Sequence, residues 1–339
     1  MTELLSVRGL RVDYPQGRRR PPFTALRDVD LDVAPGETVG IVGESGSGKS
    51  TLGNAVLGTA PVTEGRIVFE GEDITRATRA RRRRLTRDIQ VVFQDPFGSL
   101  NPMRTIGQTL EEPLLVHRPQ LGRRERRREV EAALVHVGLS AGDAARFPAN
   151  FSGGQRQRIA IARALILRPK LIICDEAVSA LDLSVQAKIL NLLRELRQEF
   201  GMAYLFISHD MSVVRHMSDR VLVLYQGQAM ERGPAADVCA DPRHPYTVRL
   251  LAAAPVPDPV EQRLRRQVGP SAETAPPPRT GCPYRYRCGR ADDACAAPLP
   301  VSRLGERTVH CHHPLGDEDD DTGGLEAIGV PGLRPRRSL

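Results

Sequence analysis

The sequence predicts an α/β fold with a mainly parallel sheet, and three observations support this class. Brief apolar runs rich in Val, Ile and Leu recur along the chain, each bounded by polar or turn residues, as is typical of buried strands. Segments with apolar residues at helical spacing lie between these runs. Strands that alternate with helices form parallel sheets. The 339 residues suffice for about two domains at roughly 150 residues each.

The expected strands are taken in chain order. The first two strand-like runs cover residues 3–12 and 29–42, and the Pro-, Gly- and Arg-rich segment 15–22 between them is expected to be a loop. Residues 38–42, at the end of the second run, lead directly into a glycine-rich loop. The remaining expected strands are residues 67–69, 89–93, 171–174, 203–207 and 221–224.

Apolar periodicity predicts two helices. Within residues 185–200 the apolar side chains fall at i, i+4, i+7, i+8, i+11 and i+15, one face of a helix made by Val185, Ile189, Leu192, Leu193, Leu196 and Phe200. Residues 125–138 repeat the pattern with Val130, Ala133, Leu134 and Val137. The stretch of about 102–155 carries helix signals and no convincing strand, so we expect a helical insert in the α/β core.

The composition changes after Gly233. Prolines become frequent, four cysteines appear, and an acidic run at 317–321 precedes a Gly-, Pro- and Arg-rich end. We therefore expect three parts: residues 1–235, a smaller extension over 236–315 that contains the cysteines, and a disordered tail over 316–339.

The charge of the chain does not by itself indicate a polyanion partner. Lys and Arg total 48 against 41 Asp and Glu, a net charge of +7, and only Lys49, Lys170 and Lys188 are lysines. A general arginine bias of the coding genome explains this excess, and local arginine runs are usually solvated faces. Aromatic residues make up 4% and Trp is absent, so stacking platforms for single-stranded nucleic acid are scarce. We expect no nucleic-acid partner.

Targeting signals are also absent from the sequence. No apolar run reaches the roughly 18 residues of a membrane span. The first residues lack a basic segment followed by an apolar one, so no secretory signal is expected. These observations predict a cytoplasmic chain.

A phosphate-binding loop follows the strand at 38–42. Eight residues satisfy G-x-x-x-x-G-K-[ST] between a strand and a helix: Gly43, Glu44, Ser45, Gly46, Ser47, Gly48, Lys49 and Ser50. Glycines let successive N–H groups point at phosphate oxygens, and the helix that follows adds its positive end. Lys49 is expected to reach the β- and γ-phosphates and Ser50 to ligate Mg²⁺, with Thr51 in support. The loop predicts a nucleotide site.

Two carboxylates end the strand at 171–174. Asp175 is placed to hold Mg²⁺ or its water, because ligands of open α/β sheets bind at the carboxyl ends of the strands. Glu176 is placed to accept a proton from water that attacks the γ-phosphate. This pair is a weak signal alone and a strong one beside the phosphate loop.

The segment 151–157, Phe-Ser-Gly-Gly-Gln-Arg-Gln, distinguishes between classes of phosphate-loop protein. It resembles the signature motif of ATP-binding cassette (ABC) ATPases, and we expect its polar and glycine residues to contact nucleotide: Ser152, Gly153, Gly154 and Gln155. The resemblance implies a phosphate-loop NTPase core of the RecA-like type with an antiparallel β subdomain and a helical insert. Residues 1–235 are then the ATPase domain.

Other motifs of that family follow in order. Gln94 resembles the glutamine that contacts Mg²⁺ or the attacking water, and Asp182 resembles the aspartate of a loop that crosses the dimer interface. His209 matches the histidine that contacts the γ-phosphate. Tyr14 resembles the aromatic residue that stacks on adenine, with Phe23 as the second choice.

The resemblance is closest to the oligopeptide and dipeptide importer branch. Residues 94–107, 174–193 and 241–247 carry it. It implies an ATP- and Mg²⁺-dependent ATPase that works as a dimer with an identical or sister subunit. It further implies two membrane permeases, an external peptide-binding protein and a position at the cytoplasmic face of the membrane. Nickel or another small solute is the alternative cargo; a soluble ABC ATPase acting on nucleic acid or ribosomes and a non-catalytic regulator are the alternative classes.

Four cysteines lie in the extension with the spacing C-x5-C-x6-C-x15-C: Cys282, Cys288, Cys295 and Cys311. They occupy a Pro- and Arg-rich segment without helix or strand periodicity, which needs a cross-link to fold. In the resembling family this segment is similar to a [4Fe–4S] site, and zinc is the alternative, although the gaps are wider than in zinc knuckles. His310, His312 and His313 flank the last cysteine; they are expected at the surface, with a place among the ligands of a zinc site as the alternative. Cys174 and Cys239 are expected to act as small apolar residues.

Overall fold

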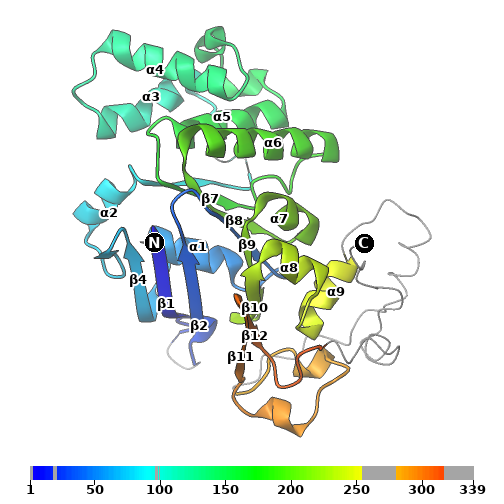
Figure 1. Cartoon of the computed structure of the whole chain (residues 1–339). Coiled ribbons are helices and arrows are strands. Elements are labelled where there is room, and N and C mark those ends of the chain that lie inside the picture. The colour runs from blue at the N-terminus through cyan, green and yellow to red at the C-terminus, as the bar shows by residue number, and fades with distance from the viewer. Residues whose placement is uncertain (1–2, 18–20, 96–97, 99, 254–279, 317–339) are drawn as a thin grey trace.

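The computed structural model describes residues 3–17, 21–95, 98, 100–253 and 280–316. Two sheets and their covering helices form the molecule (Figure 1). The helical insert lies at one end of this view and the cysteine-containing segment at the opposite end. The predicted disordered tail from about residue 316 falls almost entirely outside the described residues. Among the helices that the structure describes, none is both long and apolar enough to cross a bilayer.

The larger sheet has eight strands in the order β11-β12-β10-β9-β3-β8-β7-β6. Its parallel part contains the strands expected from the sequence, namely β3 (Thr38–Val42), β6 (Ile89–Val92), β7 (Leu171–Asp175), β8 (Ala203–Ser208) and β9 (Arg220–Tyr225). Every residue of β3 and β8 is buried, as expected for parallel strands covered on both faces. Their carboxyl ends meet at one edge, where the predicted catalytic residues begin.

Helices cover the larger sheet and follow the expected periodicity. Helix α6 (Leu183–Phe200) buries one apolar face, and Gly201 in the left-handed conformation ends it. The other covering helices are α1 (Lys49–Leu57), α7 (Met211–Met217), α8 (Ala235–Ala240) and α9 (Pro245–Ala253). The prediction of a helix over 185–200 is confirmed to within two residues.

The smaller sheet is antiparallel, as the family resemblance implies. Its order is β2-β1-β4-β5, from β1 (Leu5–Tyr14), β2 (Phe23–Val33), β4 (Val62–Phe69) and β5 (Glu72–Asp73), and α2 (Arg79–Leu85) follows it. The run expected over 29–42 is two strands, because the turn at Pro35–Gly36 separates β2 from β3.

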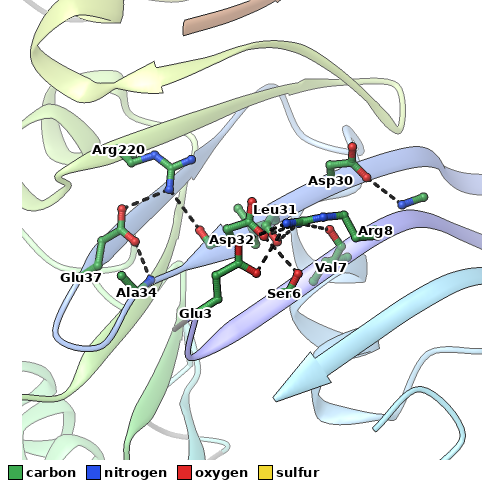
Figure 2. Close-up of polar contacts among 11 residues, drawn as sticks. Glu3, Ser6, Val7, Arg8, Asp30, Leu31, Asp32, Ala34, Glu37 and Arg220 are labelled. Carbon is green, nitrogen blue, oxygen red and sulfur yellow. Dashed lines mark hydrogen bonds and ion pairs between the residues drawn. The ribbon is translucent and has the colours of Figure 1, made fainter. Parts of the chain in front are cut away.

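Polar contacts tie the smaller sheet together and to the larger one (Figure 2). Arg8 of β1 pairs with Asp32 of β2, and Ser6 Oγ donates to the same carboxylate at 3.1 Å. Arg220 of β9 donates to Glu37 Oε1 at 3.4 Å and to the Asp32 carbonyl at 3.5 Å. Arg220 therefore joins the end of β2 to the parallel sheet beside β3.

Residues 102–155 contain helices and no strand, as predicted. The insert consists of α3 (Ile106–His117), α4 (Arg123–His136), the 3₁₀ turns Ala141–Ala145 and Pro148–Asn150, and the start of α5 (Gly153–Leu165). Thr105 caps α3 with a capping box completed by Gln108. Val130, Ala133 and Leu134 of α4 are buried, on the face that the sequence predicted.

The cysteine-containing extension differs from the expectation that it lacks regular structure. β11 (Val301–Leu304) and β12 (Arg307–His310) form a hairpin, and β12 pairs with β10 (Gln228–Pro234) at the edge of the larger sheet. The buried pair of Arg307 with Glu231 of β10, at 2.7 Å, holds this junction. Four-residue strands are too short to show alternation in the sequence, so the pattern could not reveal them.

Candidate active site

The phosphate loop lies between β3 and α1, as the motif predicts. Gly48 caps α1 with φ +102°, and a Cβ there would lie 2.8 Å from the Ala25 carbonyl oxygen. A Cβ at Gly43 would lie 2.1 Å from the Leu224 carbonyl oxygen. Both positions therefore exclude a side chain. The loop follows a strand and opens onto the N-terminus of α1, an arrangement that favours a bound anion.

Lys49 is buried beneath this loop. Its Nζ donates to the Gly43 carbonyl at 2.8 Å and to the Glu44 carbonyl at 2.9 Å. Burial lowers the pKa of Lys49, and the carboxylates of Glu176, Asp175 and Glu44 partly offset this. The ammonium is thus held among loop atoms, at the place where phosphate oxygens are expected.

A hydroxyl and a carboxylate meet beside Lys49. Ser50 Oγ donates to Asp175 Oδ1 at 2.9 Å, which joins the first turn of α1 to the end of β7. Burial raises the pKa of Asp175, and the Ser50 hydroxyl and Lys49 oppose that shift. Oxygen ligands are those that Mg²⁺ prefers, and a nearby dication favours the ionised carboxylate. These two residues fit the predicted Mg²⁺ site.

The side chains of Glu176 and His209 lie together. Glu176 Oε2 and His209 Nδ1 are 3.5 Å apart, and the side chain of His209 is 55% exposed. Glu176 has φ +49°, and its backbone N–H donates to the Ile207 carbonyl of β8 at 3.0 Å. This bond fixes the carboxylate at the edge of the sheet. Gln94 lies exposed in the loop that follows β6.

A cavity of about 220 Å³ continues from the phosphate loop toward β2. Its lining includes Phe23, Tyr225 and Gln226, together with the loop residues Glu44, Ser45, Gly46 and Ser47. Phe23 is 46% exposed there, whereas Tyr14 pairs with it across the sheet and packs against the core. Phe23, the second choice for stacking on adenine, therefore lines the same cavity as the phosphate loop. Sequence reasoning did not name Tyr225 or Gln226, because no motif marks them.

The signature segment begins helix α5. Ser152 is the N-cap of α5, and its Oγ accepts from the Gln155 backbone N–H at 3.4 Å. A Cβ at Gly154 would lie 2.5 Å from Val185 Cγ1, so this glycine allows α5 to approach α6. Gly153 has no such close neighbour. Asp182 caps α6, and hydrogen bonds from Val185 and Ser184 lower its pKa.

The signature and the phosphate loop make no direct polar contact with each other in the described part of one chain. Within the part of the chain that the structure describes, no hydrogen bond or ion pair joins residues 152–155 to residues 43–51.

The four cysteines of the extension line one small enclosed pocket. Burial raises the pKa of Cys282 to about 12 and that of Cys311 to about 11. Four thiols that line one pocket are the donor set that zinc and iron–sulfur centres use, so this set suits a metal centre. Cys174, in β7, and Cys239, in α8, are buried elsewhere.

The spacing of these thiols bears on the metal. Among the described His, Cys, Asp and Glu side chains, one group of three has its ligand atoms within 4.8 Å of one another, and it is Asp292, Cys295 and His313. No three of the four cysteine sulfurs meet this limit. His312 and His313 line the thiol pocket, whereas His310 lines a different one.

Comparison with known families gives two matches. The model described as ABC transporter matches residues 26–179, and the one described as oligopeptide/dipeptide transporter, C-terminal region, matches residues 230–295. The first match includes the phosphate loop, signature and carboxylate pair. The second includes three of the four cysteines.

Full-length relatives are similar over most of both chains. The oligopeptide transport ATP-binding protein OppF of Salmonella typhimurium is 46% identical over 307 residues, which are 88% of this chain and 92% of the relative. The di/tripeptide transport ATP-binding protein DppF of Pseudomonas aeruginosa is 46% identical over 92% of this chain and 98% of its own.

Two solved structures share the fold. CbiO1 of Clostridium perfringens, described as part of the ABC transporter complex cbiONQ, has a TM-score of 0.63 and 29% identity, covering 71% of this chain and 92% of that one. The ATP-binding cassette MJ0796, described as a dimer in a post-hydrolysis state bound to ADP and Pi, has a TM-score of 0.61 and 31% identity, covering 68% and 98%.

Proposed function

This chain belongs to the ABC transporter family, among the ATP-binding proteins of oligopeptide and dipeptide importers, and on that premise we propose that it hydrolyses ATP to drive peptide uptake. The observation that carries the proposal is identity of 46% with two peptide-transport ATP-binding proteins over nearly the whole chain. The contacts among Lys49, Ser50, Asp175 and Glu176 supply the parts that ATP hydrolysis requires.

The site residues divide the chemistry among themselves. Lys49 and the N–H groups of the phosphate loop bind the β- and γ-phosphates, and Ser50, Asp175 and Gln94 hold Mg²⁺. Bound Mg²⁺ neutralises charge on the phosphate oxygens. Glu176 accepts the proton of the attacking water, and His209 contacts the γ-phosphate and orients Glu176. We place adenine against Phe23, which lines the cavity beside the loop.

The chain acts as a dimer with membrane permeases. Because the signature segment resembles that of ABC ATPases, we propose that it faces the nucleotide of the partner ATPase, with Asp182 near the interface. The residues of this contact are Ser152, Gly153, Gly154 and Gln155. The partner is an identical chain or a sister subunit. We propose that the complex lies at the cytoplasmic face of the membrane, receives peptide from an external binding protein, and docks through residues 94–105.

Reconstitution tests this function. The chain, its partner ATPase and two permeases are placed in proteoliposomes with the binding protein on the opposite side. We expect MgATP to drive uptake of a labelled tripeptide, and the same complex carrying Glu176→Gln to drive none. ATP-driven uptake of Ni²⁺ without uptake of peptide would instead support the small-solute importer. ATP hydrolysis stimulated by nucleic acid or ribosomes would support the soluble class.

We further propose that Cys282, Cys288, Cys295 and Cys311 bind a [4Fe–4S] cluster, with Zn²⁺ as the alternative. The similarity of this segment to the [4Fe–4S] site of the peptide-importer branch supports the cluster, as do gaps between the cysteines that are wider than those of zinc knuckles. We propose that they define an extension over 236–315, although β12 of this part completes the sheet of the ATPase domain over 1–235.

Metal analysis distinguishes the two. Purified without oxygen, the chain is expected to be brown and to carry about four iron atoms. Cys288→Ala should lose the colour, because this thiol lines the pocket, whereas Cys239→Ala, in α8, should keep it. A colourless sample with one zinc per chain would contradict the cluster.

A further inference from the structure

One residue of the phosphate loop is bound directly to the cysteine-containing extension. Arg287 lies in the 3₁₀ turn Arg285–Arg287, between Cys282 and Cys288. Its Nη1 donates to Glu44 Oε2 at 2.7 Å and its Nη2 to Glu44 Oε1 at 2.9 Å, while Nη1 also donates to the Tyr225 hydroxyl at 3.2 Å. The Arg287 side chain is 11% exposed and the Glu44 side chain is 37% exposed, so the guanidinium of this two-pronged ion pair is shielded from water and the carboxylate is partly open to it.

The backbone of the same loop residue is held from the extension as well. The Glu44 N–H donates to the Tyr246 hydroxyl at 2.8 Å, and Tyr246 is fully buried in α9. Tyr246 packs against Tyr284, with ring centroids 5.3 Å apart, and Tyr284 lies two residues after Cys282. The side chain and the amide of Glu44 therefore both bind residues beyond position 240.

These contacts continue to the thiol pocket. His244, which lines that pocket with the four cysteines, accepts the Tyr246 backbone N–H on Nδ1 at 3.0 Å. Its proton is consequently on Nε2, which is buried and, among the described residues, has no hydrogen-bond partner. His244, in the wall of the pocket, is thus two residues from the tyrosine that holds Glu44.

Glu44 in turn positions the cation of the site. Its carbonyl accepts from Lys49 Nζ at 2.9 Å, so a shift of Glu44 changes where the Lys49 ammonium lies. Cys288 is adjacent to Arg287 in the sequence, Arg287 binds the Glu44 carboxylate, and the Glu44 carbonyl binds Lys49. These links connect the thiol site to the phosphate loop without a gap.

We infer that Arg287 is a positioning residue for the phosphate loop, through which the state of the four-cysteine site and ATP binding affect each other. The inference rests on the proposed ATPase function but not on which metal the thiols bind. Coupling between two sites is reciprocal: if an ordered thiol site favours ATP, bound ATP must stabilise the thiol site by the same factor.

Nucleotide affinity tests whether Arg287 supports ATP binding. Binding of a fluorescent ATP analogue with Mg²⁺ is measured on the full chain. We expect Arg287→Ala to weaken it about tenfold, and Arg287→Lys, which keeps the charge without the fork, to restore part of the loss. Glu44→Gln should weaken binding through the other partner, and Arg287→Ala should add little to it. Arg303→Ala, an exposed arginine of β11, is the control and should bind as wild type.

Thiol reactivity tests the reciprocal half, with a readout that a merely structural role would not move. Metal is first removed from the protein with a chelator, and the chelator is then removed. The rate at which DTNB modifies the four thiols is measured with and without MgATP. MgATP should slow the reaction roughly fivefold or more in wild type and have no effect in Arg287→Ala. Wild-type affinity in Arg287→Ala, or an equal MgATP effect in wild type and variant, would overturn the inference. Failure of wild type to bind ATP would refute the proposed function instead.

Discussion

Glu176→Gln should bind ATP with nearly unchanged affinity and lower the rate of hydrolysis by roughly 10²–10⁴-fold. The amide keeps the shape of the side chain, and the Glu176 backbone N–H still bonds to Ile207. It cannot accept the proton of the attacking water. Because ATP then stays bound, the variant should also remain in the closed dimer, which size-exclusion chromatography with MgATP detects.

The matched control for this variant is Glu195→Gln, which makes the same change at an exposed position of α6. Its hydrolysis rate should equal that of wild type. If Glu176→Gln retained more than about a tenth of the wild-type rate, the general-base role of Glu176 would be wrong.

Lys49→Ala should weaken ATP binding by roughly 100-fold or more, which amounts to the loss of about two charge-assisted hydrogen bonds to phosphate. The substitution removes the only cation that the phosphate-loop motif places against the phosphates. Isothermal calorimetry with MgATP measures the affinity.

A lysine outside the site provides the comparison. Lys170→Ala breaks a surface ion pair with Glu70, in which Lys170 is 48% exposed, and should leave ATP affinity unchanged. Thermal unfolding without nucleotide should show that Lys49→Ala is folded. Unchanged affinity in a folded Lys49→Ala would refute the assignment of the phosphate loop.

Local patterns were sufficient for the parallel core. Strands β3, β6, β7, β8 and β9 are buried on both faces, so they appear in the sequence as short apolar runs. Helices α4 and α6 present one apolar face at a period of 3.6 residues. The sequence therefore predicts those strands and helices whose burial leaves a regular pattern of apolar residues.

The sequence did not predict the elements that depend on contacts between distant parts of the chain or that have little apolar periodicity. β12 pairs with β10 across more than 70 residues, and its buried partner for Glu231 is Arg307. Nothing within either strand signals that partner. The short helix α2, with the sequence RARRRRL, buries only Leu85, so its periodicity is too weak to detect.

The site divides in the same way. Lys49, Asp175 and Glu176 could be predicted from the sequence, because each lies in or next to a motif whose strand, loop and helix follow one another directly in the chain. The sequence could not decide whether Tyr14 or Phe23 lies beside the phosphate loop, because the two residues pair across β1 and β2 and only the packing of these strands places Phe23 in the cavity. The Arg287 contact with Glu44 joins residues 243 positions apart, and only tertiary packing brings them together.

The hairpin β11–β12 has a consequence for biosynthesis. β10 lies between β9 and β12, so its outer edge has no partner until residues 307–310 have left the ribosome. While residues 235–310 are being synthesised, the nascent protein therefore carries an uncovered strand edge, a surface prone to intermolecular pairing. The hairpin thus protects the edge of the sheet, and a premature stop before residue 301 would leave a product with an exposed strand edge that is prone to aggregate.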